Sequence, residues 1–125
     1  MTTMFDSGAL IALDRNDRSM WVRLKGLHLV GERPVTHGGV VGQVWRGGPR
    51  QARLATALAG MDVRSLDERL GRVAGELLAS TRISDVVDAA LVALVADGDE
   101  IITLDLEDLG RLAAAAGRHI ELIRP

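Results

Sequence analysis

The chain has 125 residues, 47% of them hydrophobic and 26% charged, a composition typical of one folded domain spanning residues 1–125. Its net charge of −2 argues against a generally basic nucleic-acid-binding surface, and the absence of cysteine excludes disulfides, zinc–thiolate sites and a cysteine nucleophile. The longest wholly apolar stretch, 89–96, is far shorter than the ~20 residues of a membrane helix, and no secretory leader is visible. We therefore expect a soluble cytoplasmic protein.

Short apolar runs alternate with longer helical patterns along the chain. The first half predicts a strand at 4–5, helices at 7–13 and 17–30, a strand at 34–36, and helices at 40–46 and 50–58. The second half predicts a strand at 61–66, a helix at 66–79, a helix from a Ser84 cap to about 96, a strand at 100–103, a helix at 107–116 and a strand at 119–123. Strands that alternate with helices predict an α/β fold, a parallel sheet covered on both faces.

Two aspartates directly follow predicted strands. Asp6 comes after the first strand and Asp105 after the fourth. Ligands bind outside the carboxyl ends of the strands in open α/β sheets, close to the point where the strand order reverses. If the two strands are neighbours, both carboxylates point into the same crevice. Each aspartate also has a purely structural interpretation, as the cap of the following helix.

A third aspartate, Asp88, precedes a run of eight apolar residues and should be buried with its helix. An isolated buried carboxylate is costly unless it is paired or binds a cation. Asp85 lies one turn earlier and serves either the same site or the helix N-terminus. Asp108 follows Asp105 in the first turn of its predicted helix, where acids are common.

Such a group of carboxylates needs compensating charge. Two carboxylates ~5 Å apart at an effective dielectric of ~20 repel by roughly 3 kcal/mol. Oxygen ligands without thiols favour Mg²⁺ or Mn²⁺ over zinc. A carboxylate-held metal of this kind suits phosphodiester hydrolysis by a metal-activated water.

At this point the sequence resembles the PIN-domain ribonucleases, and in particular the VapC toxins of toxin–antitoxin pairs. The resemblance lies in residues 5–13, in 88–91 with 103–105, and in the Asp-x-x-Asp-Leu segment 105–109, and it covers nearly the whole chain. It implies a three-layer α/β/α fold with a mostly parallel central sheet, an RNA substrate, a homodimer and a VapB-type antitoxin. The metal ligands it implies are Asp6, Asp88, Asp105 and Asp108, with Ser7, Thr103 and Asp85 as auxiliary residues.

One position departs from the family pattern. The helix after the second strand normally carries a glutamate that completes the acidic site, and this sequence has Gln43 there. An amide oxygen can still ligate a metal or orient water, but it adds no negative charge. Three alternatives stay open: a working nuclease with a modified site, a degenerate domain that binds RNA or antitoxin without cutting, and an altered residue in this particular sequence.

Three arginines lie close to this position in the sequence. Arg46, Arg50 and Arg53 accompany Trp45 and a glycine turn, a combination that suits phosphate and unpaired bases. The alternative is that Trp45 packs in a core while the arginines cover a helix face. The three histidines have no ligand spacing. His37 follows a strand end, so one interpretation brings it near the crevice, but we expect it to be an ordinary surface residue.

A response-regulator-like acid pocket is disfavoured, because Lys25, the only lysine, lies within a predicted helix. The apolar runs 9–13 and 22–30 are candidate dimer or antitoxin surfaces.

Overall fold

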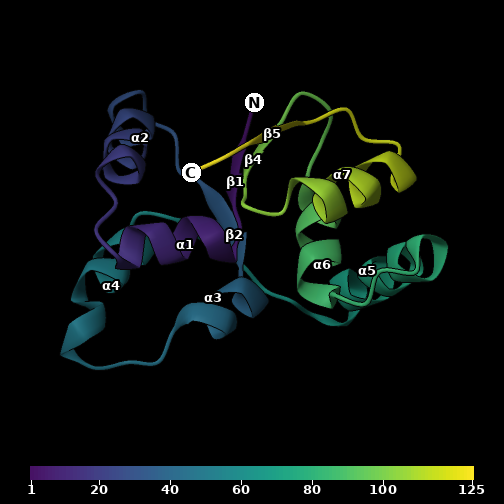
Figure 1. Ribbon diagram of the computed structural model, residues 1–125, viewed down its shortest axis with the longest axis horizontal. Helices are drawn as coiled ribbons and strands as arrows, with labels where there is room; N and C mark the ends of the chain where they lie inside the picture. The colour runs from purple at the N-terminus through teal and green to yellow at the C-terminus, as the bar shows by residue number, and fades with distance from the viewer.

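One five-stranded sheet organises the computed structural model, which describes all 125 residues (Figure 1). Its strand order is β3-β2-β1-β4-β5, and every neighbouring pair is parallel. The strands are β1 Thr3–Phe5, β2 Val35–His37, β3 Asp62–Arg64, β4 Glu100–Ile102 and β5 Glu121–Ile123. The chain leaves β1 toward β2 and β3 on one side and returns to β4 and β5 on the other. The strand order therefore reverses between β1 and β4.

Helices cover both faces of the sheet. One layer comprises α1 Ser7–Asp14, α2 Arg18–Leu29, α3 Gly38–Val44 and α4 Ala52–Ala59, with the short 3-10 helix η1 Pro49–Gln51 before α4. The other layer comprises α5 Glu68–Thr81, α6 Val86–Leu94 and α7 Leu106–Ala115. Figure 1 shows the two layers on opposite sides of the strands. The predicted three-layer α/β/α architecture is confirmed, and the sheet is entirely parallel.

The strands divide their side chains between two cores. Met4 and Ile101 pack with the layer of α5, α6 and α7, whereas their neighbours Phe5 and Ile102 pack with the layer of α1 to α4. All four are at most 1% exposed. Because successive strand side chains point to opposite faces, a short apolar strand can supply both cores. This is why Met4 and Phe5 in β1, and Ile101 and Ile102 in β4, are consecutive apolar residues without an alternating pattern.

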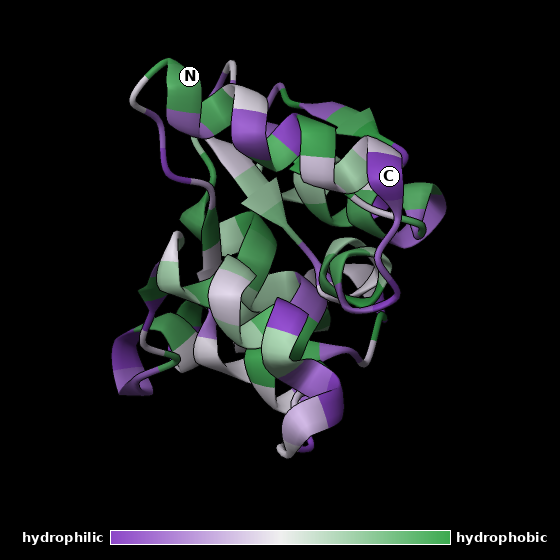
Figure 2. Cartoon of the chain, turned by 90° about the vertical axis from the view of Figure 1, so that its left-hand side faces the viewer, coloured by the Kyte–Doolittle hydropathy of each residue, from purple (hydrophilic) through white to green (hydrophobic).

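The outer face of α2 remains apolar in part. Val22, Leu29 and Val30 are 63%, 76% and 72% exposed. Figure 2 turns this side of the molecule toward the viewer, and its ribbon carries both hydrophobic and hydrophilic residues. None of the helices combines the length and the apolar composition that crossing a bilayer requires.

Several boundaries differ from the sequence prediction, and the starts of α6 and α3 matter for the site. The cap of α6 is Asp85 and not Ser84, because the Asp85 carboxylate accepts from the first free amides of the helix. Helix α6 also ends at Leu94, before the predicted limit. Helix α3 begins at Gly38, two residues early, because His37 caps it. The expectation that His37 lies on the surface is wrong: the residue is fully buried.

Candidate active site

Four carboxylates line one pocket at the carboxyl ends of β1 and β4. The pocket encloses about 360 Å³ and is lined by Asp6, Ser7, Gly8, Ile11, Asp85, Asp88, Leu104 and Asp105. We call it the acidic pocket. It lies where the strand order reverses, which is where ligands bind in open α/β folds. The pairing of Phe5 with Ile102 brings Asp6 and Asp105 to the same edge, as expected for neighbouring strands.

Asp6 is the most buried of these carboxylates, with 4% of its surface exposed. It caps α1, and its Oδ1 accepts from the backbone N–H of Ala9 at 3.0 Å. Burial raises the pKa of Asp6 above its usual value, while hydrogen bonding from the Thr103 hydroxyl opposes this shift. The Thr103 oxygen also accepts from the backbone N–H of Asp105 at 2.8 Å. Thr103, fully buried, thus connects the two strand-end aspartates.

The first turn of α6 supplies two more carboxylates. Asp85 caps the helix, with its Oδ1 accepting from the backbone N–H groups of Val87 at 2.9 Å and Asp88 at 3.1 Å. Asp88 itself is half-buried. Burial raises the pKa of the Asp88 carboxyl most, the charges of Asp85, Asp6, Asp105 and Asp108 add to the shift in that order, and together they bring the pKa to about 7. The pKa of Asp88 therefore responds to the charges of all the other carboxylates of the pocket.

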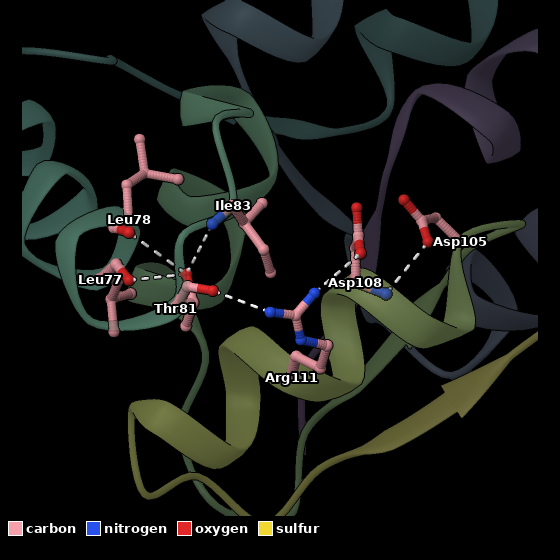
Figure 3. Close-up of polar contacts among 7 residues, drawn as sticks. All are labelled: Leu77, Leu78, Thr81, Ile83, Asp105, Asp108 and Arg111. Atoms are coloured by element: carbon pink, nitrogen blue, oxygen red, sulfur yellow. Dashed lines mark hydrogen bonds and ion pairs between the residues drawn. The ribbon is translucent and has the colours of Figure 1, made fainter.

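Asp105 and Asp108 begin α7 and face a different set of partners (Figure 3). Asp105 caps the helix through its Oδ1, which accepts from the Asp108 backbone N–H at 3.1 Å. Arg111 lies 3.8 Å from the Asp108 carboxylate and donates to the Thr81 carbonyl at 2.8 Å. Asp108 does not line the acidic pocket. Arg111 therefore ties the start of α7 to the end of α5.

Three helix N-termini converge on the acidic pocket. Asp6, Asp85 and Asp105 are the N-caps of α1, α6 and α7. Each N-terminus carries a partial positive charge and free amide hydrogens, which stabilise nearby carboxylates by about 0.3–1 kcal/mol each at exposed sites. These dipoles offset part of the repulsion among the carboxylates. They do not remove it, because the charges of the neighbouring carboxylates still add to the effect of burial in raising the pKa of Asp88.

His37 lies beside this cluster, at the carboxyl end of β2. Its Nδ1 accepts from the backbone N–H of Gly39 at 3.1 Å, and its Nε2 lies 2.9 Å from the carbonyl of Val87 in α6. A carbonyl only accepts, so Nε2 carries the hydrogen and the ring is neutral. Burial lowers the pKa of His37 below its usual value, which is consistent with that state.

The remaining candidate residues lie outside the acidic pocket. Gln43 is exposed on α3 and is not among the residues that line the pocket. Arg46, Arg50 and Arg53 are exposed, and the Arg46 guanidinium donates to its own backbone neighbours, the carbonyls of Gly42 and Trp45. Trp45 is 38% exposed and is not a core residue.

Three comparisons place the chain among known proteins. No family model matches it, and no curated protein matches it in sequence. Among solved structures it is similar to a chain of VapBC2 from Rickettsia felis, crystallised bound to a DNA fragment from its promoter, with a TM-score of 0.71, 14% identity and 98% of each chain covered. The chain has a PIN-like fold. The resemblance predicted from the aspartate motifs is thus confirmed at the level of the fold.

Within this PIN-like fold, the donors suit a hard divalent cation by their chemistry. The acidic pocket offers only oxygen atoms as charged donors, the type that Mg²⁺ and Mn²⁺ prefer. The four capping bonds of these three aspartates all end on Oδ1, so that the caps leave Oδ2 unused. The raised pKa of Asp88 also marks a place where added positive charge would be favourable. The donor set therefore fits such an ion.

The side chains are not preassembled around one ion, however. No three His, Cys, Asp or Glu side chains are arranged so that they could hold a single metal. Binding would require the carboxylates to rotate toward a common point. Rotation of an aspartate side chain is a small change, but rotation of Asp6, Asp85 or Asp105 also alters a helix cap.

Two residues near the pocket escaped the sequence prediction. His37 followed a strand as an isolated histidine, and only the succeeding Gly-Gly hinted that it could cap a helix. Leu104 separates Thr103 from Asp105 and is 60% exposed at the pocket. The sequence alone does not distinguish an exposed leucine from a buried one, so the pattern could not identify Leu104 as a pocket residue.

Proposed function

We propose that the chain is a metal-dependent endoribonuclease of the VapC type that hydrolyses RNA phosphodiester bonds in the cytoplasm. The observation that carries this proposal is the convergence of Asp6, Asp85, Asp88 and Asp105 on one pocket at the strand-order reversal of a PIN-like fold. A purely structural set of helix caps would not need to meet in one pocket with a fourth carboxylate, Asp88, that caps no helix.

In this proposal Asp6, Asp88 and Asp105 hold Mg²⁺ or Mn²⁺, with Asp108 assisting directly or through water. The bound ion supplies an activated water at neutral pH and a positive charge for a phosphate oxygen. Thr103 keeps Asp6 and Asp105 together through its hydroxyl. Asp85 and Ser7 line the same pocket and orient its solvent. In-line attack would leave a 5′-phosphate and a 3′-hydroxyl.

The surroundings support a polymeric substrate and a protein partner. Arg46, Arg50 and Arg53 are exposed and suit the phosphates of RNA beyond the scissile bond. The exposed apolar side chains of α2 offer a surface for a second copy of the chain or for a VapB-type antitoxin. The similar solved structure is a VapBC2 complex, which makes an antitoxin the expected partner.

Incubation of the pure protein with structured RNAs and Mg²⁺ tests the proposal. We expect EDTA-sensitive cleavage that is lost in Asp6→Asn, because the neutral amide cannot replace a carboxylate ligand. Cleavage by wild type at the rate of Asp6→Asn, or insensitivity to EDTA, would contradict the assignment. Asp97→Asn is a suitable control, because Asp97 is exposed and does not line the pocket.

A second candidate is a binding module with the same fold that has lost its catalytic site. Two observations favour it: Gln43 stands where a glutamate is expected, and no three acidic side chains form a ready ligand set. This alternative predicts that Gln43→Glu creates an affinity for Mn²⁺ that the present chain lacks. Calorimetry on both proteins decides between the nuclease and the binding module. Similar Mn²⁺ binding by the two proteins would contradict the idea that the site has lost its metal affinity.

A further inference from the structure

His37 joins two elements that lie 50 residues apart in the sequence. Its Nδ1 accepts from the backbone N–H of Gly39 in the first turn of α3, and its Nε2 donates to the carbonyl of Val87 in the first turn of α6. The two bonds use opposite edges of one ring. The imidazole therefore connects β2 and α3 with the helix that carries Asp85 and Asp88.

The ring has no freedom to move within this arrangement. His37 is 0% exposed. A Cβ atom on Gly39 would lie only 2.9 Å from the ring Cε1, 3.1 Å from Nδ1 and 3.0 Å from a methyl of Leu66, so glycine is required for the ring to lie this close. A buried ring with both nitrogens bonded is fixed in one tautomer and one orientation.

Val87 lies between the two carboxylates that α6 contributes. The bond from His37 thus acts on the same helical turn that Asp85 caps with its side chain. Earlier in the chain, the end of α5 is tied to α7 by the bond from Arg111 to the Thr81 carbonyl (Figure 3). That bond lies four residues before Asp85, whereas the bond from His37 reaches the first turn of α6 directly.

We propose that His37 is a positioning residue for the acidic pocket: its bond to Val87 fixes the first turn of α6, and with it Asp88, relative to Asp6 and Asp105. The inference rests on the proposed function for its consequence in metal binding, but the positional part does not. A structural alternative exists, in which His37 only caps α3 through Gly39. The two roles use different nitrogens and can be separated.

Two substitutions separate them. His37→Gln places an amide nitrogen near the position of Nε2 and can keep the bond to Val87. His37→Asn places an amide oxygen near the position of Nδ1 and can keep only the cap on Gly39. His28→Asn is the matched control, because His28 makes an equivalent Nε2 bond to the Gly60 carbonyl at 3.0 Å and does not line the pocket. Gly39→Ala, which crowds an intact ring, gives a second way to disturb the contact.

Two readouts are measured on each protein: hydrogen exchange of the Ala89 amide, which bonds the Asp85 carbonyl in the first turn of α6, and Mn²⁺ affinity by calorimetry. Exchange is expressed relative to the Ala74 amide in α5, so that loss of global stability cancels. We expect His37→Gln to resemble wild type. We expect His37→Asn and Gly39→Ala to speed relative exchange and weaken Mn²⁺ binding by roughly 3- to 10-fold, the worth of one hydrogen bond.

The proposal is overturned if His37→Asn behaves as wild type, or if His37→Gln and His37→Asn lose protection equally. An effect of the same size in His28→Asn would also overturn it. Should wild type itself bind no Mn²⁺, the metal part of the proposed function fails, and the exchange measurement alone still decides the role of His37.

Discussion

The acidic pocket and the segment 45–53, which we call the arginine segment, both contain several like charges but differ in the surroundings of those charges. In the pocket, carboxylates from three elements lie close together, and burial together with their mutual repulsion raises the pKa of Asp88 to about 7. In the arginine segment, the side chains of Arg46, Arg50 and Arg53 are exposed, and the Arg46 guanidinium donates to the carbonyls of Gly42 and Trp45. The comparison indicates that burial makes like charges unfavourable in the pocket, whereas the exposed arginines keep their contact with water.

The shape of the arginine segment depends on one buried amide. The Gln51 oxygen accepts from the backbone N–H groups of Arg46 at 2.6 Å and Gly47 at 2.9 Å, and its nitrogen donates to the Val44 carbonyl at 3.0 Å. Gln51 is only 8% exposed. A neutral side chain thus fixes this turn, while a set of charged ones surrounds the pocket. Three predictions follow the contrast from its largest expected effect to its smallest.

A divalent cation should stabilise the protein through the pocket and not through the arginine segment. At a Mn²⁺ concentration of about 100 times Kd, the free energy of unfolding should rise by about 2.7 kcal/mol. Thermal unfolding with and without Mn²⁺ measures this. The gain should be smaller near pH 5 than near pH 8, because Asp88 keeps its proton up to a pKa of about 7 and the ion must displace it.

Two variants test whether the stabilisation comes from the pocket: Asp105→Asn, and Arg50→Gln as its matched control. The first removes a pocket carboxylate, and the second changes an exposed side chain of the arginine segment. Only Asp105→Asn should reduce the stabilisation. Equal stabilisation of both variants would place the ion elsewhere on the molecule.

Asp88→Asn should stabilise the protein at neutral pH without any ion. The folded pKa of about 7 exceeds the unfolded value of 3.8, so the folded state binds more protons and stability falls as pH rises from about 4 to about 7. The variant avoids this loss. We expect a gain of about 1–2 kcal/mol above pH 7, allowing for the half-exposed side chain, and almost none near pH 4.

Chemical denaturation at the two pH values measures the effect. Asp17→Asn serves as a contrast of opposite sign, because the Ser19 hydroxyl lowers the pKa of that exposed cap and favours its charge. Asp17→Asn should lower the free energy of unfolding near neutral pH. A gain at Asp88 that is independent of pH would argue against charge repulsion as its cause.

Arg50→Ala combined with Arg53→Ala should have the smallest effect on the fold and a measurable one on RNA. Both side chains are exposed, and such substitutions usually change stability by less than about 0.5 kcal/mol. If each arginine contacts one phosphate, the slope of log affinity against log salt should fall by roughly 0.7 for each contact with single-stranded RNA. Salt titrations of the Asp6→Asn background, which is not expected to cleave, measure this. An unchanged slope would show that Arg50 and Arg53 do not contact RNA phosphates.

The fold followed from the alternation of strands and helices, and so did the meeting of the strand-end aspartates. Adjacent parallel strands present their carboxyl ends at one edge, which brings Asp6 and Asp105 together once β1 and β4 are neighbours. Asp88 was identified by its apolar helix, although it proves half-buried and not buried. These features depend on periodicity and order, which a sequence displays directly.

Other features depend on competition between adjacent residues or on contacts distant in the sequence. Ser84 and Asp85 are both good caps, and only the backbone at the start of α6 shows that Asp85 takes the role. The burial of His37 requires a carbonyl 50 residues away, and the exposure of Gln43 depends on how α3 packs. No local pattern contains that information.

Because Asp6, Asp85 and Asp105 each begin a helix, the residues that would do chemistry are also the ones that start secondary structure. An alanine scan of the pocket would therefore confuse misfolding with inactivity, since losing a cap costs about 0.5–2 kcal/mol. Asparagine caps about as well as aspartate, so it deletes the charge while keeping the helix start. Asp→Asn is therefore a single substitution that changes the charge of the pocket while it leaves each helix start in place.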